Sequence, residues 1–123
     1  MKILIDTHIF LWMLSEPGKL NQKRRYELES PANEVFLSSM SIAELIIKAS
    51  LGKININFDP LHMAEKMRVE ILNFTGVDAM ALRGMPYFHK DPFDRMIIAQ
   101  ALTNHFPLMS DDTKFLKYNC KVI

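Results

Sequence analysis

The stretch HKDPFDRMIIAQA, residues 89–101, places two carboxylates three residues apart at the head of an apolar run. Asp91 stands where a helix N-cap belongs, and Pro92 suits the first helical position because that position needs no backbone N–H. A helix over residues 92–105 would hold Asp94 in its first turn, near the positive end of the helix dipole. The stretch therefore predicts a long helix with acidic side chains at its N-terminus.

Short apolar runs alternate with helical patterns along the rest of the chain. We expect strands at residues 2–5, 35–38, 70–74 and 107–110, and a last one near 121–123. We expect helices from the first strand to Leu14 and over residues 20–29, 41–51, 60–69, 77–84 and 92–105, with a short helical turn from Asp112. Residues 53–58 fit either an edge extension of the sheet or a loop. Because strands alternate with helices, we predict one domain over residues 1–123, a three-layer α/β/α fold with a central, mostly parallel sheet.

The composition is that of an ordinary globular domain, with 49% apolar and 24% charged residues in a chain of 123. The formal net charge of +1 provides no global basic field, so a nucleic-acid partner would have to bind a local patch. Cys120 is the only cysteine, which excludes a disulfide framework within the chain and fits a reducing compartment. No apolar run approaches membrane-spanning length. We therefore expect a cytoplasmic protein that has no membrane contact.

Four acids fall at strand-to-helix junctions of the predicted fold. Asp6 ends the first strand and Asp112 follows the strand at 107–110. Asp94 begins the long helix, and Glu44 lies three residues after Ser41, a capping-box pattern that would begin the helix at 41–51. Because such junctions lie on one edge of a parallel sheet, we expect the four carboxylates to converge.

Each of these acids also has a purely structural explanation, since a carboxylate at a helix start contributes roughly 0.5–2 kcal/mol by capping. Two carboxylates about 4 Å apart, however, repel by about 4 kcal/mol at an effective dielectric constant of about 20. Such a cluster raises its pKa values or binds a cation. Oxygen ligands without cysteine or paired histidines suit Mg²⁺ or Mn²⁺, which can activate water for phosphoryl displacement. The cluster, rather than any single acid, indicates a metal site.

Polar neighbours of the acids have a weaker claim to the site. Hydroxyl groups at the same junctions could hydrogen-bond the carboxylates or a metal-bound water, or could only cap helices; they belong to Thr7, Ser38 and Ser110. Arg95 could contact phosphate or pair with an acid. Lys48, four residues after Glu44, is expected to form a helix-surface ion pair. His8 and His89 lie beside the acids, but a single histidine at a helix start is more often structural, so we assign no general base.

At this point the chain resembles the PIN-domain ribonucleases, in particular the VapC-type toxins of bacterial toxin–antitoxin pairs. The matching pieces follow the family's order and spacing: LIDTH (4–8), SSMSIAELIIKASLGK (38–53), HKDPFDRMIIAQA (89–101) and LMSDDTKF (108–115). By position, the resemblance implies that the metal is bound by four acids, which are Asp6, Glu44, Asp94 and Asp112. Asp91 is an additional acid in the DPFD stretch, better suited to a cap, with a ligand role left open.

The resemblance implies a central parallel sheet, homodimers, and Mg²⁺- or Mn²⁺-dependent hydrolysis of RNA by metal-activated water. It also implies inhibition by a small antitoxin protein whose C-terminal segment covers the active site. Two other interpretations stay open. A metal-dependent phosphatase or phospho-acceptor would use Asp6 as its nucleophile, although His8 stands where the second acid of an Asp-x-Asp pair is needed. A non-catalytic binding module would use the acids only as helix caps.

Overall fold

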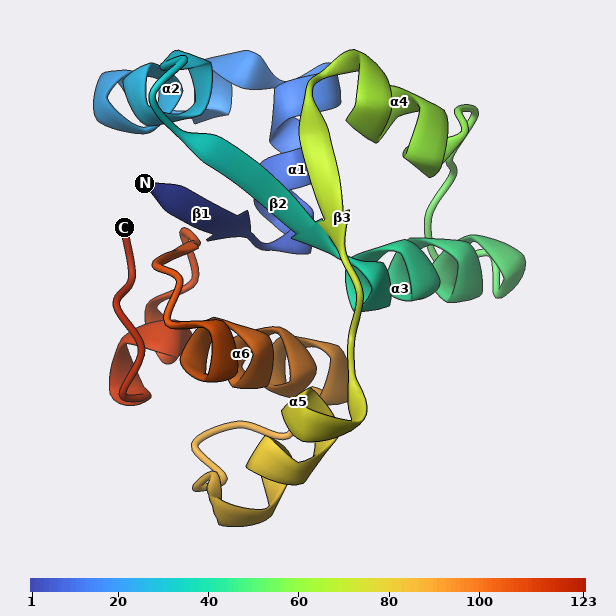
Figure 1. Cartoon of the computed structure of the whole chain (residues 1–123). Coiled ribbons are helices and arrows are strands. Elements are labelled where there is room, and N and C mark those ends of the chain that lie inside the picture. Colours follow the sequence, from blue (N-terminus) through green and yellow to red (C-terminus); the bar gives the residue numbers. More distant parts are fainter.

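The computed structural model covers residues 1–123 and places a four-stranded sheet between two layers of helices (Figure 1). The strands are β1 (Lys2–Ile5), β2 (Glu34–Ser38), β3 (Val69–Leu72) and β4 (Leu108–Met109). They lie in the order β3-β2-β1-β4, and every neighbouring pair is parallel. The predicted α/β/α architecture with a mostly parallel sheet is confirmed.

The helices divide between the two faces of this sheet. They are α1 (Thr7–Ser15), α2 (Gln22–Glu29), α3 (Ser39–Ser50), α4 (Pro60–Lys66), α5 (Gly76–Ala81) and α6 (Pro92–Asn104). Three 3₁₀ turns complete the list, namely η1 (Pro17–Lys19), η2 (Leu82–Gly84) and η3 (Thr113–Lys117). In Figure 1, α1, α2 and α4 cover one face, α5 and α6 cover the other, and α3 continues from the end of β2. None of the helices combines the length and apolar character needed to cross a membrane.

The central strand β1 is buried from both sides, because successive side chains of a strand point to opposite faces. Ile3 and Ile5 belong to one apolar cluster, which includes Phe10 of α1. Leu4 belongs to a second cluster, which includes Ile98 of α6. This double burial explains why residues 2–5 read as a continuous apolar run rather than an alternating one.

The start of α3 differs from the prediction. Its N-cap is Ser38, whose Oγ accepts a hydrogen bond from the backbone N–H of Met40 at 3.0 Å. The capping box predicted for Ser41 and Glu44 is therefore wrong. Because β2 runs directly into α3, the cap falls on the last residue of the strand, and both of those residues lie inside the helix. This shift leaves the Glu44 carboxylate available for contacts outside its own helix.

Two helices are closed by nearby left-handed residues that local patterns did not indicate. α4 ends at Lys66 rather than near residue 69, because Arg68 has φ of 59° and turns the chain into β3. β3 therefore begins at Val69, one residue earlier than predicted. α6 ends one residue short of the predicted boundary, with His105 as a left-handed C-cap at φ of 57°.

The sheet is shorter at one edge than the sequence indicated. β4 covers only two residues instead of the predicted four, and the last predicted strand is reduced to a single bridge between Leu108 and Val122. Residues 53–58 form neither strand nor helix, which decides between the two possibilities left open for them. The short edge strand leaves the polypeptide after it free to fold back beside α6.

Candidate active site

The carboxyl ends of the strands bring the predicted acids to one place. Asp6 follows β1 as the N-cap of α1, and Asp112 follows β4 as the N-cap of η3. Asp94 lies in the first turn of α6, and Glu44 enters from α3. Burial, and then the negative charges of four neighbours, raise the pKa of Asp94 to about 7. In decreasing order of effect these neighbours are Asp91, Glu44, Asp6 and Asp112. The structure therefore assembles the four acids, with Asp91, at the edge of the sheet.

Asp6 combines a capping role with deep burial. Its Oδ1 accepts a hydrogen bond from the backbone N–H of Ile9 at 2.8 Å, and the residue is only 4% exposed. Burial raises the pKa of the Asp6 carboxyl, and hydrogen bonds from the Ser110 hydroxyl and the Ile9 N–H oppose this shift. A helix cap does not need to be withdrawn from water, so capping alone does not account for a buried carboxyl at this position.

Glu44 is held by a hydroxyl on one side and an ammonium on the other. It is 4% exposed; its Oε1 lies 2.7 Å from Thr7 Oγ1, and its Oε2 lies 2.6 Å from Lys48 Nζ. Thr7 Oγ1 also lies 2.9 Å from Ser41 Oγ, and since it carries one proton, it donates to the carboxylate and accepts from Ser41. The hydrogen bond to Glu44, aided by its charge and those of the two aspartates at the start of α6, raises the pKa of Lys48. The predicted Lys48–Glu44 pair is confirmed, but it reaches into the site.

His89 lies between Asp94 and the C-terminal part of the chain. Its Nε2 is 3.5 Å from Asp94 Oδ2, and its Nδ1 is 3.0 Å from the Tyr118 hydroxyl. The His89 side chain is only 9% exposed, and burial lowers its pKa, so the ring is neutral at neutral pH. Sequence reasoning missed Tyr118, because nothing local marks a tyrosine 29 residues away as a partner of His89.

Arg95 has a different place from the one considered for it. Its guanidinium donates to the carbonyls of Pro86 and Met85 at 2.8 and 3.3 Å, and to the Tyr118 hydroxyl at 3.4 Å. The guanidinium carbon also lies 3.8 Å from the centre of the Tyr87 ring. No carboxylate pairs with Arg95, so the acid pairing that the sequence left open is not found. Its buried charge instead fixes the loop that leads into α6.

The other supporting residues act as local caps. Asp91 Oδ1 accepts hydrogen bonds from the backbone N–H groups of Phe93 and Asp94, which confirms its predicted capping role. The Ser110 hydroxyl accepts from the N–H of Asp112 at 3.0 Å and so shapes the turn after β4. Ser38 is fully buried as the cap of α3. All of them stabilise the junctions on which the acids stand.

As they stand, no three histidine, cysteine, aspartate or glutamate side chains are arranged to hold a metal ion together. The donor chemistry nevertheless fits a hard divalent cation, because the converging groups are all carboxylates. Lys48 is the one lysine or arginine whose side chain pairs with them, and it contacts only Glu44. Burial and the neighbouring negative charges raise the pKa of Asp94 to about 7, so this carboxyl is half protonated near neutral pH without metal. The donor set, four carboxylates without thiol or paired imidazole, is therefore of the kind that fits Mg²⁺ or Mn²⁺.

Fold and site together define an α/β protein with a carboxylate-rich centre at the carboxyl edge of a parallel sheet. The sequence model of the PIN domain matches residues 3–119, and the chain belongs to this family. A curated relative from Mycobacterium tuberculosis (strain ATCC 25618 / H37Rv), Ribonuclease VapC22, is 29% identical over 117 residues, covering 91% of this chain and 88% of that protein.

Solved structures share the same fold. VapBC2 from Rickettsia felis, bound to a DNA fragment from its promoter, superimposes with a TM-score of 0.72 at 18% identity and covers 100% of this chain and 98% of that one. A toxin–antitoxin complex from Klebsiella pneumoniae gives a TM-score of 0.64 at 19% identity and covers 98% of this chain and 95% of that one. The family resemblance inferred from the sequence motifs is thus confirmed.

Proposed function

We propose that this PIN-domain protein is a cytoplasmic endoribonuclease, dependent on Mg²⁺ or Mn²⁺, that serves as the toxin of a toxin–antitoxin pair. The observation that carries the proposal is the Asp94 carboxyl, whose pKa of about 7 reflects burial beside four other acids. A strongly perturbed carboxyl at a strand-end junction is typical of a functional site. The name of the curated relative, a ribonuclease, supports RNA as the substrate.

In this mechanism the ion would be held by Asp6, Glu44, Asp94 and Asp112. When bound, it supplies Lewis-acid stabilisation of the phosphate and activation of water. The protein's own contribution is orientation. Thr7 fixes Glu44 Oε1 and the Ile9 N–H fixes one oxygen of Asp6, whereas Lys48 holds Glu44 Oε2, an oxygen for which the ion would compete. Lys48, whose side chain is partly exposed, also provides positive charge beside the acids for an RNA phosphate.

The two rival interpretations find less support. A phospho-acceptor needs an accessible aspartate nucleophile, whereas Asp6 is buried and one of its oxygens caps α1. His8, at the position where such enzymes need a second acid, is exposed. A binding module with acids that only cap helices would not place these carboxyls where they raise the pKa of Asp94 to about 7. The ribonuclease therefore remains our proposal.

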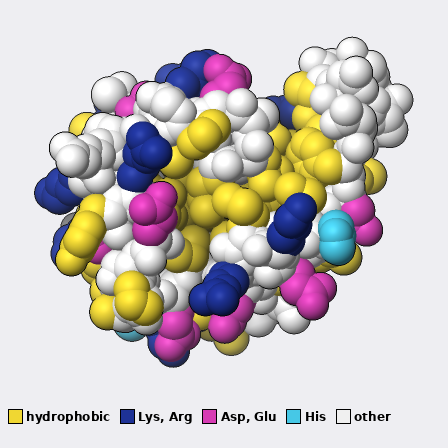
Figure 2. Space-filling model, turned by 90° about the horizontal axis from the view of Figure 1, so that it is seen from above, with side chains coloured by type: hydrophobic (Ala, Val, Ile, Leu, Met, Phe, Trp, Pro, Cys, Tyr) yellow, Lys and Arg dark blue, Asp and Glu magenta, His cyan; other side chains and the backbone are white.

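We also infer a small antitoxin protein as partner, in keeping with the solved relatives that are toxin–antitoxin complexes. The helical face formed by α1, α2 and α4 has an apolar hollow (Figure 2). A cavity of about 460 Å³ beside α2 and the starts of β2 and β3, at the opposite end of the strands from the acids, is lined by apolar side chains, including Met13, Leu20, Leu28 and Met67, and by Arg25, Arg68 and Glu29. Such a cavity suits an apolar segment with acidic side chains, and a partner bound there would contact the protein outside the active site, in addition to the segment that covers it.

A homodimer is the second assembly that we propose. Large apolar side chains are exposed on α3, whose C-terminal end projects at the right of the molecule, and on α5, which lies below α6 (Figure 1). They are Ile46, Ile47 and Leu51 of the α3 end, and Val77 and Met80 of α5. Exposed apolar groups that are neighbours on one helix, as at the end of α3, are typical of interaction surfaces.

The decisive test of the proposed activity is the pair Asp6→Asn and Asp59→Asn. Both aspartates are N-caps, and asparagine caps equally well, so both variants should fold. With purified full-length protein and single-stranded RNA, Mg²⁺ or Mn²⁺ should restore cleavage after EDTA treatment. Asp6→Asn should lower the metal-dependent rate by about 100-fold or more, whereas Asp59→Asn, on α4, should not. Cleavage that persists in EDTA, or that Asp6→Asn leaves intact, would contradict the proposal.

A further inference from the structure

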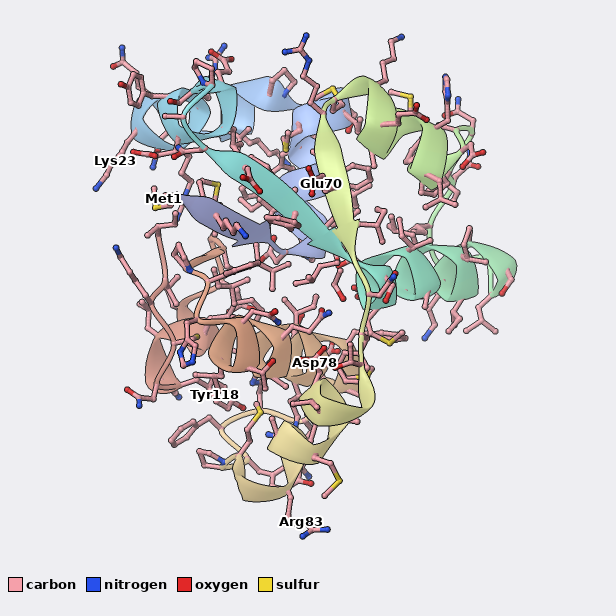
Figure 3. The ribbon with its side chains drawn as sticks, in the orientation of Figure 1. Met1, Lys23, Glu70, Asp78, Arg83 and Tyr118 are labelled. Atoms are coloured by element: carbon pink, nitrogen blue, oxygen red, sulfur yellow. The ribbon has the colours of Figure 1, made fainter.

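The Tyr118 hydroxyl is a meeting point of three nitrogen atoms. The backbone N–H of His89 lies 3.3 Å from it, Arg95 Nη1 lies 3.4 Å from it, and His89 Nδ1 lies 3.0 Å from it. Tyr118 is itself buried, beside α6 and away from the sheet (Figure 3). None of these groups touches the acids except through the His89 ring, so the arrangement requires a separate explanation.

The number of protons in this cluster determines the tautomer of His89. A tyrosine hydroxyl has one proton to donate and two lone pairs to accept. Two N–H groups, one from the His89 backbone and one from Arg95, are obligatory donors and occupy the lone pairs. The hydroxyl proton is then left for His89 Nδ1, which must accept it. In the neutral ring the remaining hydrogen therefore sits on Nε2.

His89 Nε2 is buried and has no hydrogen-bond partner in the structure. An unpaired buried donor is energetically unfavourable, so we expect the Nε2–H group to donate a hydrogen bond in the functional state of the site. The nearest carboxylate oxygen is Asp94 Oδ2, at 3.5 Å. A movement of about half an ångström would bring the pair to ordinary hydrogen-bond distance. The carboxylate that is most affected by its acidic neighbours thus has a fixed donor aimed at it.

We propose that His89 is a positioning residue for Asp94, with Tyr118 selecting the Nε2–H tautomer that holds the Asp94 carboxylate in its metal-binding orientation. The inference rests on the proposed function, because it gives Asp94 a ligand role. His89 touches neither ion nor RNA in this scheme; it acts only through Asp94. Arg95 contributes to the same arrangement. Its guanidinium donates to a lone pair of the Tyr118 hydroxyl and to the Pro86 carbonyl, and so holds the loop that carries His89.

The paired variants His89→Gln and His89→Asn separate positioning from packing. The glutamine amide reaches the ε position and can still donate to Asp94, whereas the asparagine amide reaches only the δ position, toward Tyr118. In calorimetric titration of the full-length protein with Mn²⁺, His89→Asn should bind about 10–100-fold more weakly, as expected on loss of an outer hydrogen bond to a ligand. His89→Gln should recover most of that affinity. Urea denaturation in EDTA should show similar stability for both variants, since both lose the ring.

A spectroscopic measurement checks the tautomer without reference to activity. Nitrogen-15 NMR of metal-free protein labelled at histidine should show His89 protonated at Nε2, and Tyr118→Phe should shift the ring toward the Nδ1–H form. An Nδ1–H tautomer in the wild type, or equal Mn²⁺ affinity of His89→Asn and His89→Gln, would overturn the inference alone. Absence of both Mn²⁺ binding and RNA cleavage in the wild type would overturn the proposed function as well.

Discussion

Asp94→Asn should stabilise the metal-free protein above neutral pH, although it removes a proposed metal ligand. The pKa of Asp94 is about 7 in the folded protein, against an ordinary value of 3.8. Between these pH values the folded state keeps a proton that the unfolded chain has released, so stability falls as pH rises through this window. The penalty is complete above about pH 7. Asparagine has nearly the same shape and no charge, and it therefore avoids the penalty.

The size of the effect follows from the shift. The difference between about 7 and 3.8 is about 3 pKa units, and at about 1.4 kcal/mol per unit the ceiling is about 4 kcal/mol. The side chain is 25% exposed, so water screens part of the repulsion, and we expect a gain of about 2 kcal/mol for the variant. Near pH 4 the folded carboxyl is protonated, so the substitution should change stability very little there.

The assay is urea denaturation in EDTA, near pH 4 and near pH 8, with the fluorescence of Trp12, the only tryptophan, as the signal. Asp59→Asn, at the cap of α4, is the control and should show no such pH-dependent gain. Adding Mg²⁺ should reverse the order, because an ion that binds only the folded state stabilises the wild type more than the variant. If Asp94→Asn is less stable than wild type by the same amount at both pH values, the reasoning from clustered charge is refuted.

Two further predictions concern a hydroxyl and a thiol. Thr7→Val should lower the free energy of unfolding by about 1–2 kcal/mol in urea denaturation, because the buried Glu44 oxygen loses its hydrogen-bond donor. Thr7→Ser keeps the hydroxyl and should retain most of the stability. Equal losses of stability in the two variants would show that the methyl group, not the hydroxyl, matters. Cys120 should react with a disulfide reagent near pH 8 several-fold more slowly in the folded protein than in urea, because burial raises the pKa of its thiol, and equal rates would contradict this.

The sequence was informative wherever a local rule governs the structure. The start of α6 was predicted to the residue, because Asp91 and Pro92 satisfy the backbone requirements of a helix start by themselves. The convergence of the acids was predictable for a related reason. Asp6 and Asp112 follow two strands that were predicted to be parallel, so the edge at which they meet follows from topology rather than from any contact between them.

The sequence was misleading or uninformative where a residue far away in the chain determines the direction and the hydrogen bonds of a side chain. Glu44 fits a capping box by spacing, but Thr7, 37 residues away, holds its carboxylate. Arg95 stands beside an acid in the chain, but its guanidinium turns to carbonyls of the preceding loop and to Tyr118. A one-dimensional pattern gives the residues that follow one another on a helix or strand. It gives no direction for a long side chain whose partners lie on another element.

The repulsion between the negative charges of these acids is reduced in three different ways. Asp94 keeps a proton up to a pH of about 7, Glu44 takes the ammonium of Lys48, and Asp6 accepts a backbone N–H. Each arrangement occupies an oxygen that a cation would otherwise use, which explains why the carboxylates converge without forming a ready-made cage. An incoming divalent ion would therefore compete with a proton at Asp94 and with Lys48 at Glu44. Because a proton and an ammonium balance part of the negative charge, the centre can remain stable without metal and still have the charge to bind one.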